Sequence, residues 1–239
     1  MKFNLHLCML ILCAPWLSCW GDVNLADDKP VNLRFCATAW KKSVREPLYY
    51  QLDGEYLPLR LTTSSRSGVV EYHGPNPIVF YARNKGDYAP VAQAQIPPGV
   101  KQALLLFFSR EEAPGGRRFD IKVLDDNESI FPRNSYRFIN YSTDNIVGKL
   151  SDEKFILDAN AAITIQPTQT QNNQLSLQLA EVDDNQATMI YSSVWPFHPN
   201  TRKLVILVPP EGSRMEKISM VVIPDYMPLE TAQEKQTNQ

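Results

Sequence analysis

The chain has 239 residues, of which 44% are hydrophobic and 21% are charged, and its formal net charge at pH 7 is −2. It contains no basic run of the kind that neutralises nucleic-acid phosphates, so we expect no nucleic-acid partner. A chain of this length can form two hydrophobic cores of about 100 residues each, so its stability need not depend on disulfides.

Residues 1–21 are predicted to be a signal peptide. Lys2 supplies a small positive charge, and residues 5–16 form an apolar segment that is too short to span a bilayer. We therefore expect an exported protein, periplasmic or extracellular, with no transmembrane segment in the mature chain. Leu17-Ser18-Cys19 is similar to a lipobox, so a lipid anchor through Cys19 is an alternative.

Cys36 is the one cysteine outside the predicted leader, which contains the other three. The mature chain therefore cannot form an intramolecular disulfide, even in an oxidising compartment. We expect Cys36 to be a buried, inert thiol, because the internal alignment described below places Ile139 at the equivalent position.

Alternation of apolar and polar residues along much of the chain predicts half-buried strands. Residues 31–35 and 119–123 alternate in this way. Residues 103–108 are continuously apolar, which indicates a central strand buried on both faces. Asp53-Gly54 lies between two short strand-like segments and suits a tight hairpin turn with positive φ angles. No convincing amphipathic helix is found, so the predicted fold class is all-β.

Segments of the first half of the chain recur in the same order in the second half. LDGEYLPL (52–59) matches LSDEKFIL (150–157), and residues 96–126 match residues 197–225. One interpretation is that any two β-hairpins look alike. The constant order and spacing favour instead two tandem immunoglobulin-like β-sandwich units that arose by internal duplication.

Each predicted unit has about seven strands, with the first unit at residues 29–127 and the second at residues 132–227. Residues 228–239 are predicted to be a disordered tail. The alignment also predicts that Leu105 superposes on Ile206 and Ile121 on Met220, with these side chains in the respective cores.

The segment RFINYSTDNIVGKLSDEKFIL (137–157) resembles the opening hairpins of secreted bacterial β-sandwich families of unknown function. This resemblance implies a style of fold and no activity. The chain is also similar to periplasmic pilus chaperones in having a leader and two immunoglobulin-like domains. The signature segment and the cleft pair of basic residues of those chaperones are not found in it.

No sequence motif indicates a catalytic, cofactor or metal site. His73 and His198, both expected in loops, are the histidines outside the leader, and no HxH, HExxH or CxxC pair is present. Asp125-Asp126-Asn127 and Asp183-Asp184-Asn185 lack the longer ligand run of a calcium loop. We therefore predict no catalytic residue, no cofactor and no metal site.

The aromatic residues Tyr191, Trp195 and Phe197 are the candidate partner-binding residues, because exposed aromatic side chains stack on sugars or anchor a protein. The alternative is that they pack in the core. The preferred function is a non-catalytic exported protein that binds a protein or polysaccharide of the cell envelope through loops or an exposed edge.

Two other functions stay open. A periplasmic assembly chaperone that acts by strand donation would have an exposed apolar edge strand. A hydrolase would need two carboxylates that converge on one pocket, and Glu71, Asp87 and Asp120 are unpatterned candidates for that role.

Overall fold

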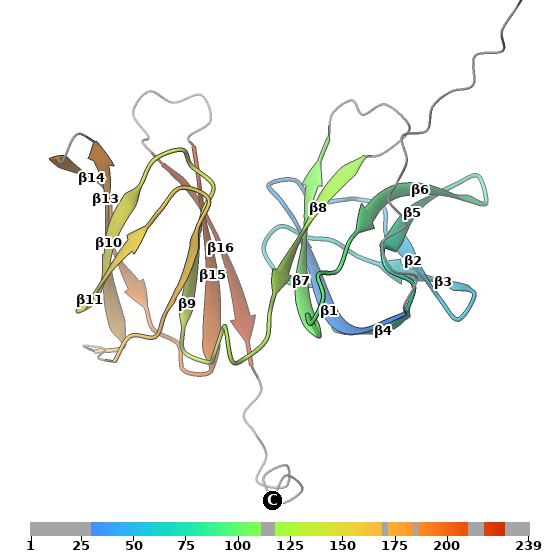
Figure 1. The fold of residues 1–239 in the computed structure, drawn as a ribbon, viewed down its shortest axis with the longest axis horizontal. Helices are drawn as coiled ribbons and strands as arrows, with labels where there is room; N and C mark the ends of the chain where they lie inside the picture. The colour runs from blue at the N-terminus through green and yellow to red at the C-terminus, as the bar shows by residue number, and fades with distance from the viewer. Residues whose placement is uncertain (1–29, 111–117, 169–171, 184–185, 210–217, 228–239) are drawn as a thin grey trace, which may run out of the picture.

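The computed structural model describes residues 30–110, 118–168, 172–183, 186–209 and 218–227 (Figure 1). These residues form sixteen strands and no helix, so the all-β prediction is confirmed. Eight strands precede residue 126: β1 (Val31–Ala39), β2 (Leu48–Leu52), β3 (Glu55–Leu59), β4 (Val70–Gly74), β5 (Ile78–Asn84), β6 (Asp87–Ala94), β7 (Gln102–Ser109) and β8 (Phe119–Asp125). Eight follow residue 135: β9 (Tyr136–Asn140), β10 (Ile146–Leu150), β11 (Glu153–Leu157), β12 (Ala162–Ile165), β13 (Gln174–Asp183), β14 (Gln186–Pro196), β15 (Thr201–Val208) and β16 (Ser219–Tyr226).

The strands form four sheets of four strands each, two sheets to a unit. Unit 1 (β1–β8) contains the sheets β3-β2-β5-β6 and β4-β1-β7-β8. Unit 2 (β9–β16) contains the sheets β12-β9-β15-β16 and β11-β10-β13-β14. Each unit is thus a sandwich of eight described strands, one more than the seven expected. The two units stand side by side in Figure 1.

The strand order is the same in both units. In each, the first strand runs parallel to the seventh, as β1 does to β7 and β9 does to β15. In each, a β-bulge interrupts the pairing of the fifth strand with the sixth, between Phe80 and Tyr81 in unit 1 and between Leu179 and Ala180 in unit 2. The units therefore share their pairing pattern down to one local irregularity.

Three apolar layers hold the four sheets together. Side chains such as Phe35, Phe80 and Leu105 fill the core of unit 1, and Phe138 and Leu177 belong to the core of unit 2. The third layer lies between the units. It contains Leu104, Leu106, Phe131, Ile139, Leu204, Ile206, Val208 and Ile223.

This third layer explains why residues 103–108 are continuously apolar. Leu104 and Leu106 face unit 2, whereas Leu105 and Phe107 face the core of unit 1. The prediction of a central strand buried on both faces is therefore confirmed. The sheet of unit 2 that contains β15 covers the second face of β7.

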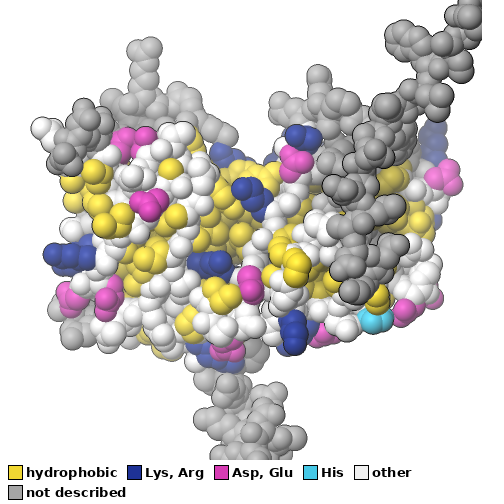
Figure 2. Space-filling view, in the orientation of Figure 1, with side chains coloured by type: hydrophobic (Ala, Val, Ile, Leu, Met, Phe, Trp, Pro, Cys, Tyr) yellow, Lys and Arg dark blue, Asp and Glu magenta, His cyan; other side chains and the backbone are white. Residues whose placement is uncertain are grey.

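The junction between the units has an aromatic end and an ionic end. At the aromatic end, Phe108 of unit 1 meets Tyr141 of unit 2 with ring centroids 6.4 Å apart, and the Lys122 ammonium lies 4.4 Å from the Tyr141 ring. Hydrophobic side chains gather in the notch between the two lobes (Figure 2). At the other end of β7, beside Gln102, lies an ion-pair cluster.

The predicted superposition of Leu105 on Ile206 is wrong by one residue. Cys36 pairs with Leu104 and Ile139 pairs with Ile206, so Leu104 and Ile206 are the equivalent residues and both face the junction. Leu105 corresponds to Leu207, in the core of its own unit. A continuous apolar run has no alternation, so the sequence gives no register for it.

The predicted superposition of Ile121 on Met220 is also wrong, by two residues, although each side chain faces the expected core. Val123 pairs with Leu105 and Met220 pairs with Leu207, so Met220 corresponds to Val123 rather than to Ile121. Ile121 and Met220 do pack against the cores of their own units, as expected.

The hairpin alignment is confirmed. Asp53-Gly54 forms the β2–β3 turn with φ angles of 51° and 84°. Leu52 pairs with Glu55 there, as Leu150 pairs with Glu153 across the β10–β11 turn.

The predicted leader and tail, and most of the two bends that follow β7 and β15, lie outside the described residues. Within the described part of the chain, no helix is long and apolar enough to cross a membrane.

Candidate functional site

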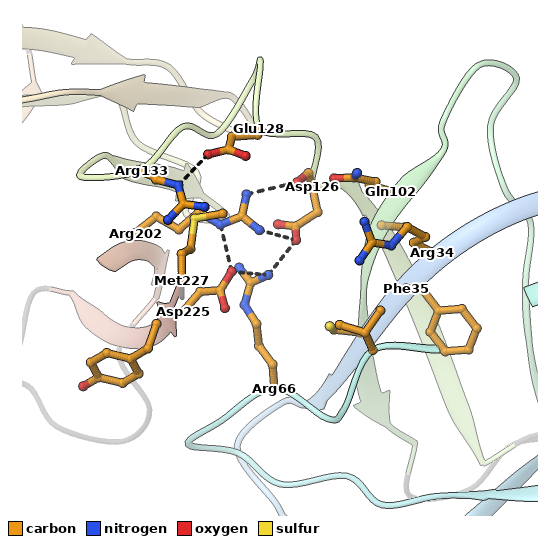
Figure 3. Close-up of a pocket in the computed structure, with 14 residues that line it drawn as sticks. Arg34, Phe35, Arg66, Gln102, Asp126, Glu128, Arg133, Arg202, Asp225 and Met227 are labelled. Carbon is orange, nitrogen blue, oxygen red and sulfur yellow. Dashed lines mark hydrogen bonds and ion pairs between the residues drawn. The ribbon is translucent and has the colours of Figure 1, made fainter. Parts of the chain in front are cut away.

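Four charged side chains from distant parts of the sequence meet at the ionic end of the junction (Figure 3). Arg66 comes from the loop between β3 and β4, and Asp126 follows β8. Arg202 lies on β15 and Asp225 on β16. The Arg66 Nη1 atom lies 2.6 Å from Asp126 Oδ2 and 3.2 Å from Asp225 Oδ2. Unit 1 and unit 2 are thus joined by ion pairs as well as by apolar packing.

Arg202 anchors this cluster from the side of unit 2. Its Nη2 lies 2.7 Å from Asp126 Oδ2, and its Nε lies 2.8 Å from Asp225 Oδ2. Its Nη1 donates to the carbonyl oxygens of Asp126 and Phe131, at 3.0 and 2.8 Å. The guanidinium also lies over the Phe131 ring, 4.8 Å from the centroid. Every nitrogen of Arg202 therefore has a partner, as a buried charge requires.

Arg66 is satisfied on one nitrogen only. Its side chain is 6% exposed, and Nη1 carries both of its ion pairs. Its Nε and Nη2 atoms are buried and have no hydrogen-bond acceptor. Buried charged donors without an acceptor are costly, which makes this guanidinium the most unusual group at the junction.

A cavity of about 520 Å³ adjoins the cluster. The charged side chains along it are Arg34, Arg66, Arg133, Arg202, Asp126, Glu128 and Asp225. Cys36, Val69, Gln102 and Met227 line other parts of it. Figure 3 shows the Arg66 side chain pointing toward Asp126 and Asp225, with Arg34 on the opposite side. The cavity is therefore lined by both arginine and apolar side chains.

Cys36 is half-buried, and it packs against the layer between the units rather than in the core of unit 1. The expectation of a thiol buried in the sandwich core is corrected, because Phe35 and Ala37 on either side of it take the core positions. Burial raises the pKa of the Cys36 thiol. A thiol in that state is a poor nucleophile. Ile139, its predicted equivalent, faces the same layer.

The unpatterned carboxylates do not meet one another. Glu71 pairs with Arg34 at 2.8 Å on β4, and Asp120 pairs with Arg110 at 2.7 Å on β8. Asp87 begins β6. Three other carboxylates line one pocket: Asp126, Glu128 and Asp225. Both junction arginines engage an oxygen of Asp126 and of Asp225, and Glu128 pairs with Arg133 at 3.0 Å.

Asp125 of the first acidic turn and His73 have structural partners. Asp125 Oδ1 accepts a hydrogen bond from the backbone of Asn127 at 3.0 Å, which closes the turn into the linker. His73 lies in β4 rather than in a loop, and its ring contacts the side chain of Asn32 on the paired strand β1. His198 follows β14 and is exposed. The second acidic turn lies partly outside the described residues.

Tyr191, Trp195 and Phe197 lie on or just after β14, the edge strand of the outer sheet of unit 2. All three are half-buried and pack against the core of that unit. Trp195 Nε1 donates to the Tyr191 hydroxyl at 3.0 Å. Trp195 also contacts Tyr136, with the Lys203 ammonium beside both rings. These aromatic residues thus support β14 from its inner side.

The outer side of the same sheet carries exposed apolar residues. Met189, Val194 and Ile156 are 55%, 59% and 68% exposed. Ile156, Val147, Ala180 and Met189 pair in turn across β11, β10, β13 and β14, so they form one apolar row across all four strands. Nothing in the described residues covers this row.

The equivalent row of unit 1 is built differently. It reads Pro58, Tyr49, Tyr81 and Pro90 across β3, β2, β5 and β6. Tyr56 and Tyr88 stack above it with ring centroids 3.8 Å apart, and they contact Tyr81 and Tyr49. Both edge strands of this sheet carry a proline, which removes a backbone donor and discourages strand pairing. In unit 2, Ile156 and Met189 occupy those two positions.

Apart from the bulge at Ile190, β14 has little of the usual protection of an edge strand. Its eleven residues include no charged side chain, and its one proline, Pro196, is at its end. The backbone N–H of Phe197 donates to the carbonyl oxygen of Asn173 at 2.8 Å. This hydrogen bond shows which residues of β14 direct their backbone groups toward β13. Trp195 and Ser193 then point their backbone groups toward β13, whereas Val194 and Ser192 point theirs to the open edge.

Sequence reasoning found the aromatic residues of β14 but not the open edge beside them. The absence of charge along residues 186–195 was a visible signal for that edge. The junction cluster had no such signal, because residues 66, 126, 202 and 225 are brought together only by the packing of the units.

Comparison of the chain with protein-family models and with curated proteins found no match.

Proposed function

We propose that the chain is an exported, non-catalytic protein that binds a protein partner of the cell envelope along the open edge of unit 2. An extended segment of the partner adds to β14 as a fifth strand of the outer sheet. The observation that carries this proposal is the uncharged edge strand β14, whose one proline is at its end. Its equivalent in unit 1, β6, contains Asp87 and has Pro90 in its interior.

The backbone of β14 supplies the affinity in this mode of recognition. Ser192 and Val194 present N–H and C=O groups to the open side, and a partner strand satisfies them in pairs. The inner aromatic residues Tyr191 and Trp195 hold the strand against the core. The edge is therefore fixed in an extended shape before the partner arrives, which lowers the entropic cost of binding.

The side chains of β14 define the kind of segment that fits. Met189 and Val194 leave an apolar outer face. A partner strand with apolar residues at alternate positions can extend that face by cross-strand contacts. We therefore expect an extended peptide segment with alternating apolar residues, and not a folded polar surface.

The test selects ten-residue peptides from a random display library against the chain and maps the selected peptides by NMR. Amide shifts are expected in β14, centred on Ser192 and Val194. Ser192→Pro should abolish binding, because it removes a donor that points to the open edge and leaves the β13 ladder intact.

Ser192→Ala is the matched control, because it removes the hydroxyl and keeps the backbone N–H. It should bind as the native chain does. Selected peptides that map to another surface, or that bind Ser192→Pro unchanged, would overturn the proposal. So would a neutral envelope polysaccharide that binds through Trp195 while no peptide does.

An assembly chaperone that pairs strands with its subunits is a second candidate, because the same exposed apolar edge would serve it. The two functions differ in their effect on an unfolded partner. A chaperone raises the refolding yield of a subunit that lacks one strand, and Ser192→Pro removes that effect. A simple binding protein leaves the yield unchanged.

We also infer that the two units are immunoglobulin-like and descend from one ancestral sandwich. Their common strand order, the bulge at equivalent residues and the matching hairpin registers support this. On this view, duplication produced two outer sheets, of which one closed its edges with Pro58 and Pro90 and the other kept β14 open for binding.

A further inference from the structure

We propose that the cavity at the junction of the units binds a small organic carboxylate, and that Arg66 holds it through Nε and Nη2. This site is separate from β14. It is formed by unit 1, the linker and unit 2 together, so neither unit contains it alone (Figure 3).

The geometry of the guanidinium points to a carboxylate. Nε and Nη2 lie on one edge of the group, and their two N–H bonds are parallel, at the spacing of the two oxygens of a carboxylate. In Arg66 these are the two nitrogens without an acceptor, while Nη1 holds Asp126 and Asp225. Arg66 is thus kept in place by one nitrogen, and its bidentate edge is buried without an acceptor among the described residues.

The charge of the cavity favours a ligand with a single negative charge. Four arginines line it, namely Arg34, Arg66, Arg133 and Arg202, against the three carboxylates of Asp126, Glu128 and Asp225. Glu71, which pairs with Arg34, brings the formal balance of these groups to zero. A carboxylate adds one negative charge beside Asp126 and Asp225, whereas a doubly charged phosphate adds two and is repelled more strongly.

The rest of the wall favours an organic ligand over a bare ion. Cys36, Val69 and Met227 provide apolar contact, and Gln102 provides a side-chain amide. The free edge of Arg66 is buried. The ligand therefore reaches it only when the surface loop moves aside, and this loop carries both Arg66 and the exposed Val69. A uronic acid of a polysaccharide and the C-terminal carboxylate of a peptide both meet these conditions.

The experiment measures thermal stabilisation and calorimetric binding of the full chain at constant ionic strength. The probes are glucuronate, the peptide N-acetyl-Ala-Ala with a free C-terminus, glucose as the uncharged sugar, and inorganic phosphate. At least one of the two carboxylates is expected to bind and to raise the unfolding temperature, and glucose and phosphate are not. Which carboxylate binds more tightly identifies the source of the ligand.

Arg66→Lys is the decisive variant, because lysine keeps the charge beside Asp126 and Asp225 but has no bidentate edge. It should weaken carboxylate binding by about tenfold or more, the effect of losing one charge-assisted bidentate contact. Arg110→Lys, in an exposed ion pair away from the cavity, is the matched control and should bind normally.

Val69→Glu tests the site independently of the ion cluster. Val69 is 59% exposed, so the variant should fold, and its new carboxylate should repel the ligand. Val69→Lys should not weaken binding. Failure of both carboxylates to bind the native chain would refute the proposal, as would unchanged binding in Arg66→Lys and Val69→Glu. In that case the role of Arg66 would be limited to its ion pairs with Asp126 and Asp225.

Discussion

At the scale of single residues, β1 shows how one strand serves two layers. Phe35 and Ala37 are in the core of unit 1, and Cys36 between them faces unit 2. The period of two was visible in the sequence. A second packed layer was not, because a side chain that points away from one core can face solvent or another unit equally well.

Cys36 should react slowly with a thiol reagent in the native chain and fast after denaturation. Burial raises the pKa of its thiol, so little of the reactive thiolate is present near neutral pH. The reaction of the native chain should accelerate as the pH rises, because thiolate then forms. The absorbance of the released chromophore follows the reaction in a chain that lacks residues 1–21, where Cys36 is the one thiol.

Cys36→Val is the companion variant. It nearly conserves volume at a half-buried position, so it should lower the free energy of unfolding by less than about 1.5 kcal/mol. Native labelling as fast as that of the denatured chain would show that the junction does not shield this thiol.

At the scale of elements, the β10–β11 hairpin shows how much a local pattern can establish. The leucines and glutamates that match between the two hairpins correctly predicted the turns and the strand pairing. They did not reveal that Gly148 on β10 lies beneath the ring of Phe155 on β11. Gly148 is a glycine because the ring occupies the place of its side chain.

Gly148→Ala should destabilise the chain by about 1–3 kcal/mol, the usual cost of overpacking a core. A Cβ atom at residue 148 would lie 2.1 Å from Phe155 Cζ. The ring cannot swing away freely, because it is buried and packs on Phe138 at a centroid distance of 5.0 Å. Urea unfolding measures the change.

Gly68→Ala is the control, because a Cβ atom there meets nothing within 4 Å. It should leave the urea midpoint almost unchanged. The smaller side chain in Phe155→Leu should recover part of the loss when combined with Gly148→Ala. Equal stability of Gly148→Ala and Gly68→Ala would disprove the contact.

At the scale of the whole molecule, the two sandwiches form one stack of four sheets. The apolar layer of Leu104, Leu106, Leu204 and Ile206 joins the inner sheets, and the buried cluster around Arg202 fixes them at one end. A buried ion pair contributes orientation more reliably than stability, because desolvation offsets much of its attraction. We therefore expect the cluster to set how the units sit against each other.

Arg202→Ala should lower the free energy of unfolding by about 3–5 kcal/mol, the typical cost of removing one partner from a buried ionic cluster. It leaves Asp126 and Asp225 paired with Arg66, and it leaves two backbone carbonyls without the Arg202 donor. Chemical denaturation monitored by tryptophan fluorescence measures the effect.

Arg110→Ala provides the comparison for that measurement. Arg110 and Asp120 form an ion pair whose side chains are 47% and 49% exposed, and such surface pairs contribute at most about 1 kcal/mol. If both variants lose the same stability, the junction cluster is no stronger than a surface pair and does not hold the units together.

The sequence by itself determined the class of fold, the central strand covered on both faces, the tight hairpins and the resemblance between the halves. These features depend on the alternation of side chains along a strand and on turn residues, which are local properties. Only the tertiary structure decided the register of residues 103–108, the layer between the units, the ion cluster and the open edge of β14. Each of these depends on which surfaces pack together, and a linear pattern states that a face is apolar without stating what covers it.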